Sequence, residues 1–129
     1  MNKEDNFKEK FKEALISTLK VISDDYKINE NENKNLKSKN LNFLEIDSIK
    51  NKEDYNKIRA ETDSEALKRK FSNNNIFQQN APSNSSCKLL YNISEKIRYE
   101  VLGTKMLKGI SCNLKNNYSY KLLNKKKDH

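Results

Sequence analysis

The apolar residues of this chain recur at three- and four-residue steps, and this spacing constrains the fold more than any other feature. In the first stretch the spacing places one wide stripe on a helix, with lysines and Glu13 on the other side. Asp5 or Asn6 can cap the first turn, and Ser23 ends the pattern. A stripe of this width needs a partner helix. Its members are Phe7, Phe11, Ala14, Leu15, Thr18, Leu19 and Ile22.

Apolar residues are scarce overall, since hydrophobic and charged residues each make up 34% of the 129 residues. Such a composition lies toward that of disordered chains, but clustering at helical spacing favours a folded core. A chain of this length forms one domain at most. We therefore expect a mainly α, small helical domain of three main helices.

Helical spacing disappears after the first helix. Residues 29–35 form a polar run rich in Asn and Glu, between Tyr26–Ile28 and Leu41–Ile46. We prefer a short β-hairpin with a long loop for this region, and a disordered linker is the alternative.

A second helix is predicted to begin at Asn51 or Asp54, either of which can cap its first turn. Residues 73–75 end this helix, and Ile76–Phe77 is expected to pack back as one short turn before Pro82. The apolar side of the helix consists of Tyr55, Ile58, Thr62, Ala66, Leu67 and Phe71.

A third helix is predicted after several N-cap candidates in Ser83–Ser86. Beyond Gly103 its stripe moves to a rotated face. Either one helix is buried on two sides, or the chain kinks between Gly103 and Gly109, because glycine costs about 1 kcal/mol relative to alanine in a helix interior. We favour one continuous or slightly bent helix packed against two neighbours. The two parts of the stripe are Leu90, Ile93, Ile97 and Val101, then Leu107, Ile110, Leu114 and Tyr118.

These elements divide the chain into an amphipathic helix (1–25), a polar loop or hairpin (26–52), a helical core (53–122) and a basic tail (123–129). Within the core, opposite charges at Arg59, Asp63, Arg98 and Glu100 form either a buried polar network between two helices or a docking face for a partner. Opposite charges that are partly buried usually satisfy each other, which favours the network.

The net charge of +8 raises the question of nucleic-acid binding. Only three residues are arginines, the lysines are spread along the chain, and no aromatic and basic residues interleave as in base-stacking proteins. We therefore expect a solvated basic surface without a nucleic-acid partner. The N-terminus lacks an apolar signal region and no run approaches the roughly 18 apolar residues of a membrane span, which predicts a cytoplasmic protein without a membrane partner.

Catalytic and cofactor motifs are missing from the sequence. Two glycines cannot supply a phosphate-binding loop, and Ser64 has no histidine to activate it. Cys87 and Cys112 stand apart with His129 as the only imidazole, so no zinc site can assemble within the chain, and both thiols are expected to be reduced and partly buried. The sequence thus predicts no catalytic, cofactor-binding or metal-binding residue.

Two blocks of residues stand out by their order and spacing. The first is an Arg-x-x-x-Asp-Ser-x-Ala-Leu run, and the second is an Arg-x-Glu-x-x-Gly run followed by a glycine and an Asn-Leu pair. Together they resemble the N-terminal region of the CobT subunit of the aerobic, ATP-dependent cobaltochelatase. Phe71 departs from that family, in which an imidazole often stands near the end of the first block. The matching residues are Arg59, Asp63, Ser64, Ala66 and Leu67, then Arg98, Glu100, Gly103, Gly109, Asn113 and Leu114.

The resemblance implies a non-catalytic segment of an enzyme subunit. The enzyme is a ligase that inserts cobalt into a corrin ring, hydrogenobyrinic acid a,c-diamide, during cobalamin biosynthesis. By resemblance, the subunit assembles with an AAA+ ATPase subunit and acts on the large subunit that holds the corrinoid. ATP, magnesium and cobalt are implied for the complex, and none is expected on this segment. Residues expected at a partner interface, or in a structural motif, are Arg59, Asp63, Ser64, Leu67, Arg98, Glu100, Gly103, Gly109 and Asn113.

The family's C-terminal half resembles a von Willebrand A type domain with an Asp-x-Ser-x-Ser run, which this chain lacks. We therefore expect the N-terminal portion of such a subunit, either a truncated gene product or a fragment. A small basic helical module that binds nucleic acid or an acidic protein is the alternative. A degenerate fragment without present activity is a third.

Overall fold

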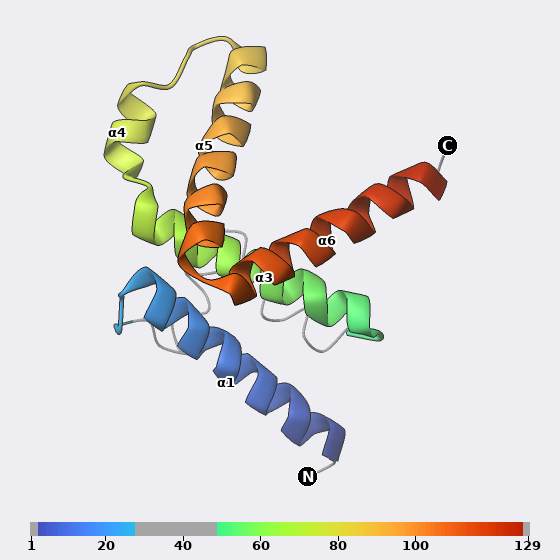
Figure 1. The fold of residues 1–129 in the computed structure, drawn as a ribbon. Coiled ribbons are helices and arrows are strands. Elements are labelled where there is room, and N and C mark those ends of the chain that lie inside the picture. The colour runs from blue at the N-terminus through green and yellow to red at the C-terminus, as the bar shows by residue number, and fades with distance from the viewer. Residues whose placement is uncertain (1–2, 28–48, 128–129) are drawn as a thin grey trace.

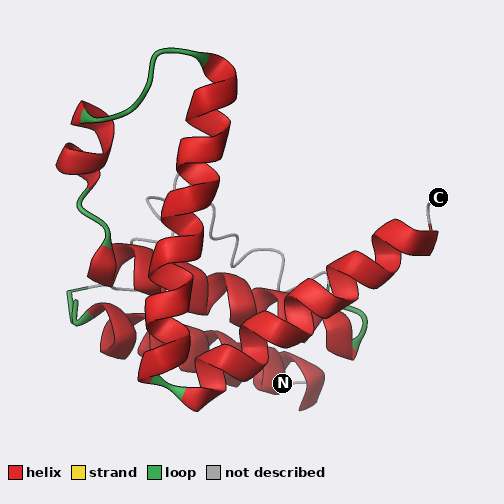
Figure 2. Cartoon of the chain, turned by 45° about the horizontal axis from the view of Figure 1, so that its top comes forward, coloured by secondary structure: helices red, strands yellow, loops and turns green. Residues whose placement is uncertain are grey.

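The described part of the chain, residues 3–27 and 49–127 of a computed structural model, is built from helices and short connections (Figure 1). These residues contain no strand (Figure 2). The predicted mainly α class is confirmed. The predicted hairpin lies largely outside the described residues, and its described ends, 26–27 and 49–51, are not extended strands. The helices are α1 (Lys3–Ser23), α3 (Lys52–Phe71), α4 (Asn74–Gln79), α5 (Ser85–Met106) and α6 (Lys108–Lys127).

Helix α3 is the centre of the fold. Helix α1 packs along one side of it, while α5 and α6 pack on the other (Figure 1). Consequently α3 is buried around most of its middle, and not along a single side as the spacing of its apolar residues predicts. Three of its buried residues, Thr62, Asp63 and Ser64, are polar, and the other three are Ala60, Ala66 and Leu67.

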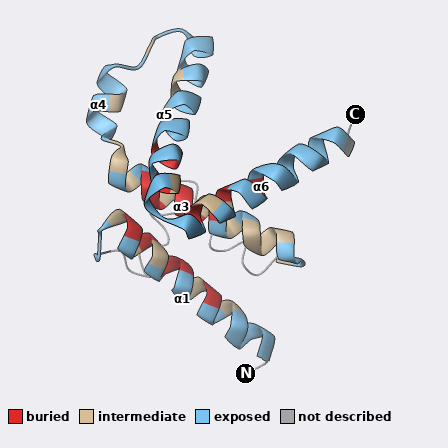
Figure 3. Ribbon diagram, viewed as in Figure 1, coloured by how far each residue is buried: buried red, intermediate tan, exposed pale blue. Residues whose placement is uncertain are grey.

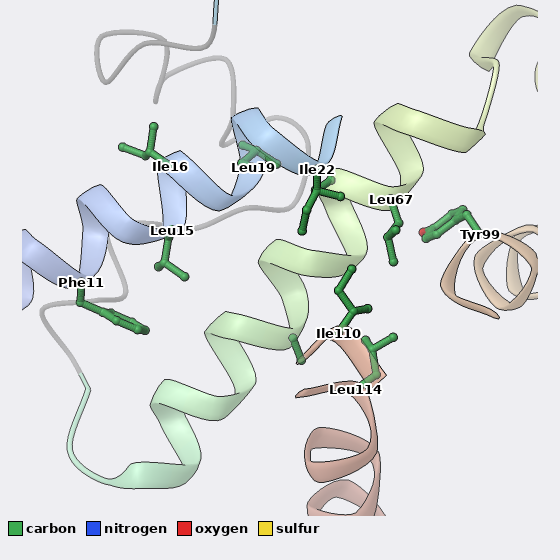
Figure 4. Packing of buried hydrophobic residues seen from close by; sticks show 11 residues of the cluster. Phe11, Leu15, Ile16, Leu19, Ile22, Leu67, Tyr99, Ile110 and Leu114 are labelled. Carbon is green, nitrogen blue, oxygen red and sulfur yellow. The ribbon is translucent and has the colours of Figure 1, made fainter. Parts of the chain in front are cut away.

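The α1–α3 interface is hydrophobic. The ring of Tyr55 meets the ring of Phe11 edge-on, with centroids 4.9 Å apart. Figure 4 shows Phe11, Leu15 and Ile22 of α1 directed toward α3 and Ile16 directed away from it, with Leu67 lying close to the residues from α5 and α6. The predicted stripe is therefore the buried face in part: Phe7 and Ala14 are exposed and Thr18 is half-buried, while Ile16, outside the stripe, is buried. The buried residues of α1 are Phe11, Leu15, Ile16, Leu19 and Ile22.

Helix starts follow local capping chemistry. Asn51 is the N-cap of α3, and its Oδ1 accepts the Asp54 amide hydrogen at 2.9 Å. Asp54 Oδ2 in turn accepts the Lys50 amide hydrogen at 3.0 Å, so both predicted cap candidates act at this start. The predicted cap of the first helix is wrong, because α1 already begins at Lys3 and includes Asp5 and Asn6.

The single long third helix is the main error of the sequence prediction. Helix α5 ends at Met106, Leu107 is extended with φ −138° and ψ 128°, and α6 begins at Lys108. The chain thus breaks between Gly103 and Gly109, as the alternative stated. The corner gives α6 a direction of its own, in which Ile110 and Leu114 join the core and Asn113 reaches Asp63 of α3.

The first half of that stripe is exposed. Leu90, Ile93, Ile97 and Val101 lie on a face of α5 that no described helix covers, and α5 is largely pale blue in Figure 3. Helix α4 instead packs on a different side of α5, where Phe77 stacks on Tyr91 with ring centroids 4.5 Å apart. The Tyr91 hydroxyl donates to the Phe77 carbonyl at 2.9 Å.

Two surface properties complete the description. Cys87 and Cys112 are free thiols and both are exposed, so the predicted partial burial is wrong. Among the residues that the structure describes, a helix with the length and apolar character of a membrane span is not found.

We expect Leu19→Ala to lower the free energy of unfolding by about 2–5 kcal/mol, because Leu19 is 0% exposed and its loss leaves a cavity in the core. Val21→Ala is the matched control, since Val21 is 62% exposed on the same helix. Its effect should stay within about 0.5 kcal/mol. Urea denaturation followed by far-UV circular dichroism measures both. Equal effects would contradict the burial of Leu19 in the core.

Candidate functional site

The two blocks that stand out in the sequence meet in space. The first lies on α3, and the second runs from the last turns of α5 into α6. Three contacts join them: Ser64 with Glu100, Asp63 with Asn113, and Leu67 with Gly103. These residues lie where α3, α5 and α6 converge, and they define the candidate site.

Glu100 is the centre of this site. Its side chain is buried, and each carboxylate oxygen receives one hydrogen bond from a different helix. Ser64 Oγ of α3 donates to Oε1 at 2.7 Å, and Tyr118 Oη of α6 donates to Oε2 at 2.7 Å. A buried carboxylate is expensive unless its oxygens find donors, and hydrogen bonds to a charged acceptor are the strong ones. Glu100 therefore ties three helices together.

Asp63 forms the second polar link. Asn113 Nδ2 of α6 donates to its Oδ2 at 2.8 Å. Burial raises the pKa of the Asp63 carboxyl above its ordinary value, while the Asn113 hydrogen bond and the charge of Arg59 oppose the rise. Arg59 itself is exposed, with its guanidinium carbon 5.8 Å from the centre of the Phe11 ring.

Two tyrosines border the carboxylate. Burial raises the pKa of the Tyr99 hydroxyl, and a hydrogen bond with Ser64 partly offsets this rise. Burial also raises the pKa of Tyr118, and its bond to Glu100 adds to the effect because that bond favours the protonated hydroxyl. Both hydroxyls are consequently neutral at physiological pH, which keeps Tyr118 available as a donor.

The close approach of α3 and α5 depends on Gly103. A Cβ atom at this position would lie 2.9 Å from Leu67 Cγ and nearer still to the two methyl groups of that residue. Leu67 is completely buried, so it has little room to move away. Glycine here allows the backbone of α5 to rest on the Leu67 side chain.

The other predicted site residues lie outside the network. Arg98 is exposed, pairs with Glu95 at 2.6 Å and donates to the Phe71 carbonyl at 2.7 Å near the end of α3. Its hydrogen bond lowers the pKa of Glu95. Gly109 is exposed, and a Cβ added there would meet nothing within 4 Å. Arg98 on α5 thus binds the carbonyl of the last residue of α3 and joins these two helices at the surface.

Sequence reasoning missed the role of the tyrosines. Tyr118 was expected only as the last apolar position of a stripe, although its hydroxyl completes the hydrogen bonding of Glu100. The sequence contained a signal for this role. A buried carboxylate requires hydrogen-bond donors, and Tyr118 follows Leu114 of the same apolar stripe by one helical turn. Asn117 is also buried on α6 and had no predicted role.

The site is equipped for holding helices together. Its carboxylates, hydroxyls and amides bind one another, and within residues 3–27 and 49–127 no group of three or more His, Cys, Asp or Glu gathers as a metal site requires. Asp63 and Glu100 are buried in a polar network, but their hydrogen-bond partners are the neutral side chains of Asn113, Ser64 and Tyr118. The expected hydrogen-bonded pairing of these carboxylates with Arg59 and Arg98 is not formed, because both arginines lie at the surface. For the exposed residues of the two blocks, a role at a partner interface stays a prediction.

Gly103→Ala should destabilise the fold by about 1–3 kcal/mol, because the new methyl group overpacks Leu67. Gly109→Ala is the matched control on α6. It should be neutral or stabilising by up to about 1 kcal/mol, since alanine is the better helix former and the site is open. Thermal and urea unfolding measure the pair. A stable Gly103→Ala variant would show that α5 does not rest on Leu67.

Asp63→Asn should change how stability depends on pH. The folded chain keeps a proton on Asp63 that the unfolded chain releases above the ordinary pKa of 3.8. Stability from this carboxyl is therefore complete below that value and is lost as pH rises through the folded pKa. The wild type should lose stability relative to Asp63→Asn over this range. Urea titrations at a series of pH values test this, and parallel curves would contradict it.

Comparison with known proteins adds one finding. A family model described as cobalamin biosynthesis protein CobT matches residues 5–129. No curated protein matches the chain, and no solved structure does. The matched range includes all of the helices that form the site as well as both blocks. The chain belongs to the CobT family of cobalamin biosynthesis proteins.

Proposed function

We propose that this chain is a non-catalytic N-terminal part of a CobT-like subunit of ATP-dependent cobaltochelatase. It supports insertion of cobalt into hydrogenobyrinic acid a,c-diamide by docking to partner subunits. Family membership over residues 5–129 supports a role in cobalamin biosynthesis. The observation that carries the docking role is that buried members of both blocks hold α3, α5 and α6 together, while Arg59 and Arg98 of the same blocks are exposed on the surface so formed.

The burial of these residues bears on whether they act in catalysis or in holding the fold together. Glu100 and Asp63 are the carboxylates in the site, and both are buried and hydrogen-bonded to neighbouring helices. A general acid, base or metal ligand has to reach its substrate. These two carboxylates instead hold α5 and α6 in fixed positions on α3. The rigid surface so formed is suited to recognising another protein.

In the proposed enzyme, ATP hydrolysis belongs to the AAA+ ATPase subunit, and the corrinoid and cobalt belong to the large subunit. Magnesium accompanies ATP. This chain contributes the contact surface, and the complex works in the cytoplasm. Arg59 and Arg98 are exposed members of the two blocks, and they are the first side chains we assign to that contact.

A binding experiment tests this assignment. The intact chain should co-purify with the AAA+ ATPase subunit, or with the large subunit, of a cobaltochelatase from the same source at moderate salt. The double variant Arg59→Glu, Arg98→Glu should bind about tenfold more weakly or worse, because exposed charges set partner choice. Lys10→Glu, Lys57→Glu is the matched control, since it reverses two exposed charges elsewhere. Circular dichroism confirms that each variant is folded.

A competition assay provides the functional readout. Excess chain should slow cobalt insertion by the assembled enzyme, because it occupies the docking site of the full-length subunit. The double variant should compete less well than its control. A chain that binds neither subunit and leaves cobalt insertion unchanged would rule out the docking role.

A further inference from the structure

Positive charge is distributed unevenly over the fold. Helix α6 carries six lysines and no acidic residue. On α5, Glu100 is buried in the polar network and Glu95 is paired with Arg98, while Lys88, Lys96 and Lys105 are exposed. The surface formed by α5 and α6 is therefore strongly basic, with no exposed carboxylate left unpaired on either helix.

An unpartnered apolar surface lies between the same two helices. Ile97 and Ile93 precede Glu100 by three and seven residues, so they share its side of α5, which receives the Tyr118 hydroxyl from α6. Leu122 follows Tyr118 by four residues and shares its side of α6. These four residues, Ile93, Ile97, Tyr118 and Leu122, are called the α5–α6 apolar face.

The α5–α6 apolar face is open to solvent. Ile93 is 46% exposed, Ile97 56%, Tyr118 39% and Leu122 62%. Helix α4 covers the Tyr91 side of α5, and α3 covers the side with Tyr99 and Gly103, which leaves this face without a partner among the described residues. Figures 1 and 2 both show α5 and α6 diverging from their junction. Exposed aliphatic side chains grouped in this way mark interaction sites.

Charge and shape together define the occupant. We propose that the α5–α6 apolar face binds an amphipathic helix of a partner protein, whose apolar side is flanked by acidic residues. A third helix placed between two diverging helices contacts both of them by ordinary side-chain packing. Lys96, Lys121 and Lys125 border the face, and the Lys121 ammonium lies 5.8 Å from the centre of the Tyr118 ring. Acidic flanks on the partner would meet these lysines.

Two other occupants fit less well. A second copy of this chain would bring another lysine-rich α6 against the first, and like charges would oppose the pairing. A membrane surface is flat, whereas the apolar residues are divided between two helices that diverge (Figure 1). The inference does not depend on the cobaltochelatase assignment, because it rests on exposure, charge and the divergence of α5 and α6.

The test uses the purified full chain and two labelled helical peptides. The first has leucines at helical spacing with glutamates beside them, and the second carries lysines in place of those glutamates. Fluorescence anisotropy should show binding of the glutamate peptide that weakens with added salt, and at least about tenfold weaker binding of the lysine peptide. Equal binding of both peptides, or no binding of either, would overturn the proposal.

Matched variants locate the binding site. Ile97→Asp, and separately Ile93→Asp, should each weaken binding of the glutamate peptide about tenfold or more, because each puts a like charge into the apolar contact. Val21→Asp places the same charge at an exposed apolar position of α1 and should leave binding unchanged. Lys96→Glu, Lys125→Glu should weaken binding, whereas Lys10→Glu, Lys57→Glu should not. Circular dichroism verifies folding, and equal losses in variants and controls would refute the site.

Two further measurements separate the other occupants. Light scattering of the chain alone would reveal a dimer, and a dimer that Ile97→Asp dissolves would assign the face to a second copy. Vesicles of phosphatidylglycerol and phosphatidylcholine test a membrane surface, and a labelled single-stranded DNA tests nucleic acid. Binding to either of these that requires Ile97 and exceeds binding to the glutamate peptide would replace the proposed occupant. A monomer that prefers the glutamate peptide supports it.

Discussion

The fold depends on a buried carboxylate that one helix alone cannot satisfy. Glu100 on α5 takes its two hydrogen bonds from Ser64 on α3 and Tyr118 on α6. Removing either donor leaves a buried carboxylate oxygen without a hydrogen bond. The free-energy cost of this unsatisfied oxygen exceeds the net stabilisation that the hydrogen bond provides. The three helices are therefore fixed relative to one another by a polar requirement, while the hydrophobic contacts around them would tolerate a range of packings.

Gly103 makes that arrangement geometrically possible. It lies three residues after Glu100 on the same helix, so the carboxylate and the close backbone contact with Leu67 are adjacent on one face of α5. On α3, Ser64 and Leu67 show the same spacing of three residues. The hydrogen bond between Ser64 and Glu100 and the contact between Leu67 and Gly103 therefore lie three residues apart on both helices. This accounts for the spacing of these residues within the two blocks of this chain.

The sequence predicted much of this because helical spacing and capping are local properties. Phe11, Leu15, Leu19 and Ile22 define the buried face of α1, and Asn51 caps α3 as expected. The spacing could not predict which faces of the helices pack against one another. Spacing groups Leu90, Ile93, Ile97 and Val101 on one side of a helix, but it does not say whether another helix covers that side. The polar network was predicted only in outline, since its donors come from residues up to 50 positions away.

The break at Leu107 shows why local signals fail at this point. Two glycines near it weaken a helix without dictating a corner. On one straight helix Gly103, Ile110 and Leu114 would share a face, because Ile110 and Leu114 follow Gly103 by seven and eleven residues, so apolar spacing does not signal the break. The corner instead gives α6 its own direction, in which Ile110 and Leu114 join the core while Gly103 stays against Leu67. The two helices diverge beyond it. Beyond this break no described helix covers Ile93 and Ile97, so the exposed apolar face is a geometric consequence of how the core is packed.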